Sequence, residues 1–526
     1  MKKFWILLLA ITILGAGLRI LKLDKNPNHL GNDEISIAYD SYSVRLTGMD
    51  EHHKKLPLSF VSHRDYKAPL YAYLNMPFNF VFGNNEYGVR FLSAFAGTLA
   101  IILIAVLGRL LVNEKVALMA AFLLALNPQS IYASRMAFES NLASVILLLA
   151  IFCLFKFKKE NKNYLLLLSG LFFGFSLWAY HTEKGLSPLL MLAFPLLWIK
   201  EIKFKKWFLM WVMAFLVILP IFIDFIKVQT RDPFNRASSQ IWYQGVSIQN
   251  YLATTDDYWI KKGLKVIIDP IYRYTEHFGI NFLFTEGMDI FPKNEPLNFG
   301  WFLLATLPLL LIGLVKIKPI FGQNSKAILM WWLICPIVPS LTYGQPSSVR
   351  NLPFIMPTIL IMAGGLFFIW SKYKNYFWVL LTLILINFFY FSVAYFIHFP
   401  KITGDNFQYG YKQALEEIKK IESNYETIIV ETRFGEFGQY VGLPRLYWGY
   451  WGAFDAWKMA NRVNDECVDK YCFRNIDWND EDINGNSVYV VSTSNPTVNE
   501  SIKKLRLWKT IFKPDQQPQF LIYIPN

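Results

Sequence analysis

Long apolar runs dominate the chain up to about residue 400, and short polar stretches separate them. A helix that crosses a bilayer needs about 20 mostly apolar residues. The first run follows Met1-Lys2-Lys3, as a signal peptide does, but ten further apolar runs favour an uncleaved first helix. The pattern predicts eleven spanning helices, near residues 4–21, 88–112, 116–133, 141–156, 163–180, 186–199, 207–226, 299–315, 327–343, 351–370 and 376–397.

The charges between these runs predict an orientation. If the N-terminus is cytoplasmic, the cytoplasmic connections contain 17 basic residues against three acidic ones, Glu114, Glu160 and Glu201. An excess of Lys and Arg marks the cytoplasmic side of membrane proteins. The short connections on the other side hold only Arg135, Lys184 and Arg350. The 17 are Lys2, Lys3, Arg109, Lys115, Lys156, Lys158, Lys159, Lys162, Lys200, Lys203, Lys205, Lys206, Lys316, Lys318, Lys326, Lys372 and Lys374.

The composition agrees with a multi-pass protein of the cell membrane. The 526 residues are 54% hydrophobic and 17% charged, whereas soluble domains carry roughly 25% charged residues. Four cysteines exclude a scaffold built from disulfides. The net charge is +13, and the excess of 14 in the cytoplasmic connections accounts for it. The positive charge is therefore an orientation signal and does not indicate nucleic acid as a partner.

Three polar segments lie outside the membrane in this orientation: residues 22–87, residues 227–298 and the tail from residue 400. In the tail, residues 413–421 have helical spacing, while 427–432, 487–492 and 520–524 read as strands. We therefore expect a transmembrane domain over residues 1–399 and an extracytoplasmic α/β domain over residues 400–526. Cys467 and Cys472 lie in this tail, where oxidising conditions allow a disulfide.

The first outer segment holds the most informative residues. Asp33-Glu34 comes about a dozen residues after the first span and precedes an amphipathic stretch, Ile35 to Leu46, that can lie on the membrane interface. A carboxylate beside low-dielectric surroundings can act as a general base. The alternative is that the pair only begins a helix, since acidic residues favour first turns.

Further motifs follow this pair in a fixed order: Gly48-Met49-Asp50-Glu51-His52, Tyr66-Lys67-Ala68-Pro69-Leu70-Tyr71, Phe82-Gly83 and Arg90. Together they resemble the GT-C superfamily of membrane glycosyltransferases, in particular the branch with the protein O-mannosyltransferases and the lipid A aminoarabinose transferase. Ser134-Arg135 with Glu139, His277-Phe278, Asn281 to Phe284, Arg350 and Phe407 to Lys412 extend the resemblance over most of the membrane region.

The resemblance implies transfer of a sugar from a polyprenyl-phosphate donor to an acceptor hydroxyl at the outer membrane face, with inversion at the anomeric carbon. Asp33 would be the general base, and Glu34 a helper or a structural neighbour. The acceptor stays open among a protein, a lipid and a glycan, and so does the sugar. Membrane lipid surrounds the enzyme.

The departing phosphate needs a cation or a metal ion to stabilise its charge. Lys67, Arg135, Lys184 and Arg350 are outward basic residues, and Glu139 can pair with Arg135 or contact the sugar. Each basic side chain can instead snorkel to lipid headgroups. Glu51, His52 and His53 are candidate ligands for a divalent metal ion, but their spacing matches no established cage, and a solvated loop is the alternative.

Two other functions compete with the enzyme. A transporter or flippase of lipid-linked sugars would also have many spans, but it would place charges near the membrane midplane. A structural factor with an outer domain gives no reason for the ordered motifs of the first outer segment.

Overall fold

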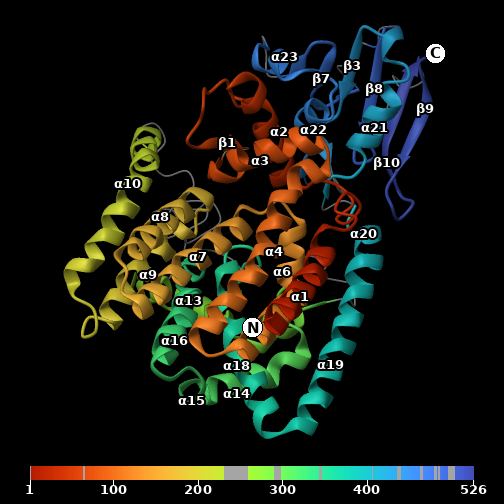
Figure 1. Ribbon diagram of the computed structural model, residues 1–526. Helices are drawn as coiled ribbons and strands as arrows, with labels where there is room; N and C mark the ends of the chain where they lie inside the picture. Colours follow the sequence, from red (N-terminus) through yellow and green to blue (C-terminus); the bar gives the residue numbers. More distant parts are fainter. Residues whose placement is uncertain are drawn as a thin grey trace. The chain divides into compact units, whose positions relative to one another are not determined.

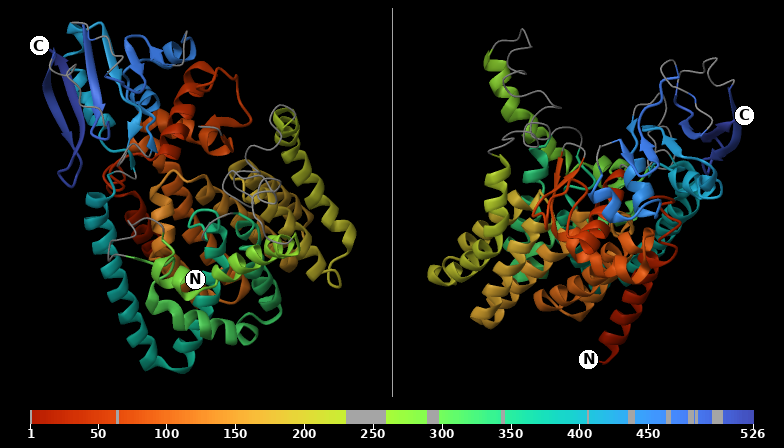
Figure 2. Two further views of the ribbon diagram at one scale, coloured as in Figure 1. Left: turned by 180° about the vertical axis from the view of Figure 1, so that it is seen from behind. Right: turned by 90° about the horizontal axis from the view of Figure 1, so that it is seen from above.

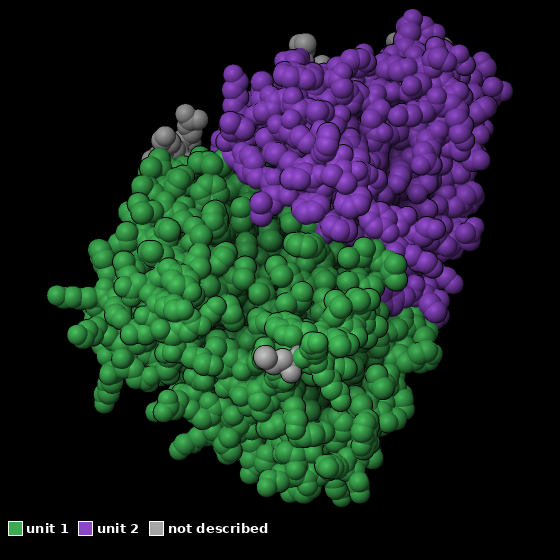
Figure 3. Space-filling view, in the orientation of Figure 1, with its two compact units in different colours: residues 1–21, 58–71, 92–393 green, residues 22–57, 72–91, 394–526 purple. Residues whose placement is uncertain are grey.

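The computed structural model describes residues 2–62, 65–229, 259–288, 298–342, 346–404, 407–434, 440–462, 466–478, 483, 486–495 and 504–526. The chain forms two compact units, which Figure 3 colours separately. Unit 1 comprises residues 1–21, 58–71 and 92–393, and unit 2 comprises residues 22–57, 72–91 and 394–526. Helix α4 (Glu86–Leu111) contributes its first turns to unit 2 and the remainder to unit 1.

Unit 1 is almost entirely helical (Figure 1). Besides most of α4 and the hairpin of β1 (Phe60–Ser62) and β2 (Asp65–Lys67), it contains α1 (Lys2–Ile20), α5 (Glu114–Ala125), α6 (Pro128–Arg135), α7 (Glu139–Glu160), α8 (Asn163–Ala179), α9 (Glu183–Leu197), α10 (Phe204–Gln229), α13 (Trp259–Glu276), η1 (Asn281–Glu286), η2 (Leu304–Thr306), α14 (Leu307–Val315), α15 (Ile317–Phe321), η3 (Gly322–Asn324), α16 (Ser325–Ile334), α17 (Ile337–Ser340), η4 (Leu352–Phe354), α18 (Ile355–Lys372) and α19 (Lys374–Val393).

Every predicted span coincides with helix, but the number of helices able to cross a membrane is smaller. Among the described residues, six helices are long and apolar enough, and eight if each of two bent pairs counts as one span. The runs at 299–315 and 327–343 fall in one such pair, bent by 74°. The runs at 163–180 and 186–199 form α8 and α9, of 17 and 15 residues. By length and composition, the described residues therefore supply six to eight of the eleven predicted spans. Most of the predicted outer loop 227–298 lies outside the described residues.

Residues at the junction of the second bent pair account for the bend between its helices. Helices α5 and α6 meet at 59°, where the Asn127 side chain accepts a hydrogen bond from the Ser130 N–H and Pro128 opens α6. The break leaves carbonyls at the end of α5 without helical partners. The buried guanidinium of Arg19 donates to the carbonyls of Leu124 (3.0 Å) and Ala125 (3.2 Å). A charged side chain within the first span thus stabilises the bend.

Helices α14 and α18 pack closely because each presents a glycine to the other. A Cβ at Gly313 would collide with the Ile361 carbonyl, and one at Gly365 would collide with the Leu309 carbonyl. Small residues let transmembrane helices approach to backbone contact. This pair forms one side of a groove considered below.

Unit 2 joins the first outer segment to the tail. It contains most of α3 (Leu70–Phe82), together with α2 (Asn32–Thr47), η5 (Ala394–His398), α20 (Phe399–Ile402), α21 (Tyr411–Ile418), η7 (Glu422–Asn424), α22 (Pro444–Tyr450) and α23 (Ala456–Ala460). The predicted helix at Ile35 to Leu46 is present as α2. It is buried from Glu34 to Val44, so it presents no free apolar face to a membrane interface.

The tail carries a six-stranded sheet in the order β6-β7-β3-β8-β10-β9, seen from two further sides in Figure 2. Its strands are β3 (Thr427–Val430), β6 (Cys467–Val468), β7 (Tyr471–Phe473), β8 (Ser487–Ser492), β9 (Leu505–Phe512) and β10 (Pro518–Pro525), and β4 (Arg433–Phe434) pairs separately with β5 (Tyr440–Val441). Strand β3 runs parallel to both neighbours, and β10 antiparallel to both of its own. The predicted helix and three strands are confirmed, as is the α/β class of the tail.

A disulfide joins Cys467 and Cys472, confirming the pair considered from the sequence. The two residues are direct partners across β6 and β7. Since β6 is an edge strand of the sheet, the bond fastens that edge. Cys153 and Cys335 are free and buried in unit 1.

Candidate active site

Asp33 and Glu34 lie in the first turn of α2 and face different surroundings. The Glu34 carboxylate turns back and accepts a hydrogen bond from the N–H of Gly31 at 3.0 Å, which caps the helix. Neighbouring helical residues are rotated by about 100° from each other. Glu34 is therefore buried, 1% exposed, while Asp33 is exposed. The pair divides into an internal carboxylate and one that solvent or a substrate can reach.

Arg90, in the first turns of α4, fixes the segment that leads to Asp33. Its Nε and Nη2 donate to the two oxygens of Glu34, both at 2.8 Å. Its remaining N–H groups donate to the carbonyls of Leu23 (3.0 Å), Pro27 (2.7 Å) and His29 (2.5 Å). A guanidinium has five N–H donors, and all five are used here. One fully buried side chain thus sets the path of residues 23–34.

Residues of the tail hold the other side of this segment. The buried His29 donates from Nδ1 to the carbonyl of Phe407 at 2.8 Å, and its ring lies among those of Tyr409, Tyr447 and Trp451, with centroids 5.0–5.7 Å away. Burial lowers the pKa of His29 to about 4, against smaller opposing effects of Glu86 and the Phe407 bond. The imidazole is therefore neutral at pH 7.

Two further contacts join the first outer segment to the tail within unit 2. The Tyr447 hydroxyl donates to the Leu30 carbonyl at 2.5 Å. The Lys412 ammonium forms an ion pair with Glu86 at 2.8 Å. The segment before Asp33 is therefore held by hydrogen bonds from Arg90 and by contacts with residues 407–451. The tail is part of the framework of the candidate site.

The candidate metal ligands lie in a turn after α2. The Asp50 carboxylate accepts hydrogen bonds from the N–H groups of His52 (2.9 Å) and Lys54 (2.8 Å). The Glu51 carboxylate lies 3.5 Å from His52 Nε2 and 3.9 Å from Arg445, and the contact with Glu51 raises the pKa of His52. Across the described residues, no three His, Cys, Asp or Glu side chains are grouped to hold a metal ion. Metal binding by Glu51, His52 and His53 stays a prediction, and the hydrogen bonds to Asp50 hold this turn.

The remaining predicted site residues belong to unit 1. Arg135 ends α6 and is 0% exposed, and its Nη1 donates to the carbonyls of Leu18 (3.1 Å) and Leu21 (2.9 Å). At least this nitrogen is used within the fold, at the end of α1. Glu139 is the first residue of α7 and is half-buried.

Three more predicted cations come from separate parts of unit 1. Lys67 is the last residue of β2 and is buried, 7% exposed. Lys184 lies in the first turn of α9, with its ammonium 3.0 Å from His181 Nδ1. Arg350 is half-buried just before η4, and Ser347 accepts its backbone N–H. Asp33 and Glu34 belong to unit 2, so convergence of all these residues on one cavity stays a prediction.

Sequence reasoning named Arg90 as part of a motif but gave it no role. A charged residue inside an apolar span is costly unless it is paired, and Arg90 follows Glu86 by one helical turn within such a run. That signal indicates a buried ion pair near the membrane surface. It does not reveal that the partner of Arg90 is Glu34, because Glu86 is the nearer carboxylate in sequence. The roles of His29 and Tyr447 had no signal of this kind.

The family model for dolichyl-phosphate-mannose-protein mannosyltransferase matches residues 66–224. This interval starts at Tyr66 of the second motif and contains Lys67, Arg90, Arg135, Glu139 and Lys184. Among curated protein sequences, none matches the chain significantly.

Solved structures of the same fold extend over nearly the whole chain. ArnT from Cupriavidus metallidurans in the apo state is 12% identical with a TM-score of 0.56, covering 99% of this chain and 98% of ArnT. The same enzyme bound to undecaprenyl phosphate gives a TM-score of 0.55, 12% identity and coverage of 99% and 97%. The archaeal oligosaccharyltransferase AglB from Archaeoglobus fulgidus, in complex with an inhibitory peptide and a dolichol-phosphate, is 13% identical with a TM-score of 0.50. That match covers 86% of this chain and 63% of AglB.

These findings confirm the predicted fold class. The chain has the polytopic, mostly helical fold of the GT-C glycosyltransferases, followed by a tail that contains a sheet. The family model matches less than half of the chain, and the structural matches, at 12–13% identity, show the fold. The apolar helices and this fold are those of a multi-pass membrane protein.

Proposed function

We propose that the protein is an inverting glycosyltransferase that moves a sugar from a polyprenyl-phosphate donor to an acceptor hydroxyl at the outer membrane face. The exposed carboxylate of Asp33, on a segment whose neighbouring side chains are fixed, carries this proposal. A general base must be reachable by the substrate and held in place. Asp33 combines exposure with the rigid support of Glu34 and Arg90.

In the proposed reaction, Asp33 accepts the proton of the acceptor hydroxyl while that oxygen attacks the anomeric carbon. The bond from this carbon to the phosphate oxygen breaks, and the configuration inverts. Glu34 acts as a positioning residue, because its two oxygens are occupied by Arg90 and Gly31. The structural match to ArnT bound to undecaprenyl phosphate supports a carrier of that chemical class.

The negative charge on the departing phosphate would be met by cations of unit 1. We assign this role first to Lys67, the last residue of the β1–β2 hairpin, and to Lys184 and Arg350, with Glu139 toward the sugar. Arg135 stays a candidate with less support, because its Nη1 is bound to carbonyls of the α1 end. A cation beside a developing phosphate charge is worth more in a water-poor site than in bulk water.

The orientation follows from the charges of the connections, which predict a cytoplasmic N-terminus and an extracytoplasmic tail. As part of the same proposal, residues 1–399 form the transmembrane domain and residues 400–526 the extracytoplasmic domain. A donor with its tail in the bilayer presents its phosphate at the membrane surface, which suits a site on residues 22–87. Protein, lipid and glycan acceptors all carry suitable hydroxyls.

The test uses the full-length protein reconstituted in lipid with polyprenyl-phosphate sugars and candidate acceptors, following release of the lipid phosphate. Asp33→Asn should abolish transfer while the protein inserts and melts normally. Asp24→Asn, nine residues earlier in the same segment, is the matched control and should retain activity. Full transfer by Asp33→Asn would remove Asp33 from its role. Movement of intact lipid-linked sugar across the bilayer, without transfer, would favour the flippase.

A further inference from the structure

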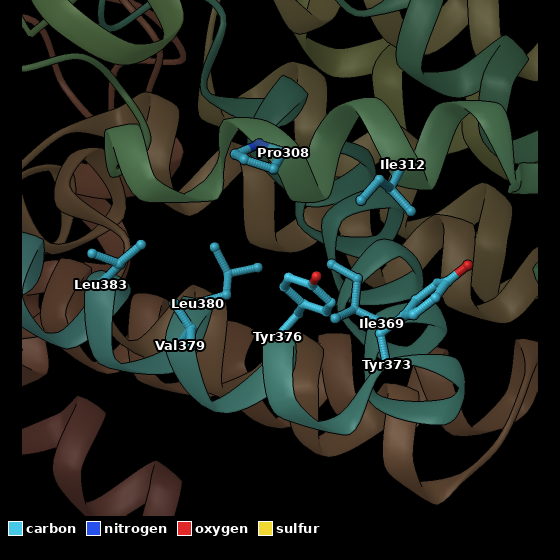
Figure 4. Close-up of a pocket in the computed structure, with 8 residues that line it drawn as sticks. All are labelled: Pro308, Ile312, Ile369, Tyr373, Tyr376, Val379, Leu380 and Leu383. Atoms are coloured by element: carbon cyan, nitrogen blue, oxygen red, sulfur yellow. The ribbon is translucent and has the colours of Figure 1, made fainter.

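Unit 1 has an apolar groove that no step of the proposed reaction uses (Figure 4). It has a volume of about 400 Å³ and lies between α14, α18 and α19. Figure 4 shows the α14 residues facing those of α18 and α19 across it. The side chains that line it include Pro308, Ile312, Ile369, Tyr376, Leu380 and Leu383.

Three lysines lie at one end of the groove. Lys316 follows Ile312 by four residues, so it lies on the same face of that helix one turn on. Its ammonium lies 5.5 Å from the ring of Phe368, next to the lining residue Ile369. Lys372 and Lys374 flank Tyr373, which also lines the groove. Three cations therefore stand where α14 and α18 end and α19 begins.

The charge at this end is almost entirely positive. The stretch from residue 299 to residue 399 contains no aspartate or glutamate. In the described part of the chain, no carboxylate forms a salt bridge with Lys316, Lys372 or Lys374, and Glu114 of the neighbouring connection pairs with Arg109. Lys115 adds a further ammonium, 3.8 Å from the ring of Trp370. Clustered lysines at a membrane surface attract anionic lipid headgroups.

The length of the groove suits a single leaflet. The nine residue steps from Lys374 to Leu383 correspond to about 14 Å of helix rise, close to half of a hydrocarbon core roughly 30 Å thick. Tyr373 and Tyr376, 54% and 70% exposed, lie near the lysine end, and tyrosines favour the level of the headgroups. The polar and apolar parts of the groove are thus ordered as they are in a phospholipid.

We propose that this groove binds one anionic glycerophospholipid of the bilayer. An acyl chain lies along Ile312, Ile369 and Leu380, and the phosphate is held by Lys316, Lys372 and Lys374. These lysines belong to connections predicted to be cytoplasmic, so the lipid would come from that leaflet. The site is separate in its residues from those proposed for sugar transfer.

The test is native mass spectrometry of the purified full-length protein after removal of lipid. Phosphatidylglycerol and phosphatidylcholine with the same acyl chains are titrated side by side. We expect phosphatidylglycerol to bind more tightly, and the triple variant K316Q/K372Q/K374Q to weaken it roughly tenfold with little effect on phosphatidylcholine. The matched control, K159Q/K200Q/K203Q, removes three exposed lysines from other connections and should keep the preference.

A second pair of variants tests the apolar part. Leu380→Trp fills the groove and should reduce the binding of both lipids, whereas Leu385→Trp, on an exposed position of the same helix outside the groove, should not. Equal binding of the two lipids to the unaltered protein would mean ordinary lipid contact and overturn the proposal. So would a polyprenyl phosphate that displaces phosphatidylglycerol at equal concentration, because the groove would then take the carrier. Unchanged binding in the triple lysine variant would also overturn it.

Discussion

The ion pair between Glu34 and Arg90 allows a quantitative prediction. Both side chains are buried, at 1% and 0% exposure, and they share two hydrogen bonds of 2.8 Å. Glu34→Ala leaves a guanidinium buried with three carbonyl partners and without its hydrogen-bonded carboxylate. Removing one member of a buried ion pair costs about 3–5 kcal/mol of folding free energy. Glu34→Gln should cost less, because its amide oxygen still accepts one of the two bonds.

The measurement is thermal unfolding of the purified protein in detergent. Glu34→Ala should melt several degrees below the unaltered protein, while Glu416→Ala, an exposed glutamate on α21, should change the melting temperature little. Glu34→Gln, which keeps one acceptor for the Arg90 guanidinium, should melt between Glu34→Ala and the unaltered protein.

Two results would refute this reasoning. If Glu34→Ala melts at the same temperature as the unaltered protein, the ion pair is solvated, contrary to the burial of both side chains in the structure. If Glu34→Gln melts as low as Glu34→Ala, the hydrogen bonds between Arg90 and this side chain do not account for the cost.

Three further predictions concern unit 2. Burial lowers the pKa of His29 to about 4. The neutral imidazole therefore stabilises the folded protein above pH 6.5, and this contribution, about 3 kcal/mol in full, is lost as the pH falls toward 4. In His29→Asn, the melting temperature should fall less on acidification. Glu51 raises the pKa of His52. The protonated imidazole therefore makes a small contribution to folding stability below pH 6.5, which is lost as the pH rises through the folded-state pKa. The melting temperature of His52→Gln, measured between pH 6 and 8.5, should lack that decline. Cys472→Ser opens a short loop and should cost the tail about 2 kcal/mol; a reductant should produce the same shift in the unaltered protein and none in the variant.

The hydrophobic pattern was sufficient for most elements of the fold. Apolar runs located most helices of unit 1, although α13 falls in the predicted outer loop 227–298, and the strand pattern located β3, β8 and β10 in the tail. Hydropathy reports apolarity but not direction, so it could not show that the runs at 299–315 and 327–343 form one bent pair. Strands β6 and β7 have two and three residues, too few to show a period. Strand β9 is mostly exposed, and its pattern is correspondingly weak.

The sequence indicated where the candidate site begins but not how it is held. Asp33-Glu34 was recognisable as a motif, yet the difference between the two carboxylates depends on Arg90, 56 residues away. The contact between His29 and Phe407 spans 378 residues. Local periodicity contains no information about such pairs, because they arise only when distant segments pack into one unit.

The discontinuity of unit 2 has a consequence for biogenesis. The segment before Asp33 is synthesised before the membrane region, and its partners Phe407 and Tyr447 are synthesised after it. At about 5–20 residues per second, the 378 residues between His29 and Phe407 take roughly 20–80 s to translate. During that interval the first outer segment has no tail to pack against. The order of the chain thus delays completion of unit 2 until the intervening membrane region has been made.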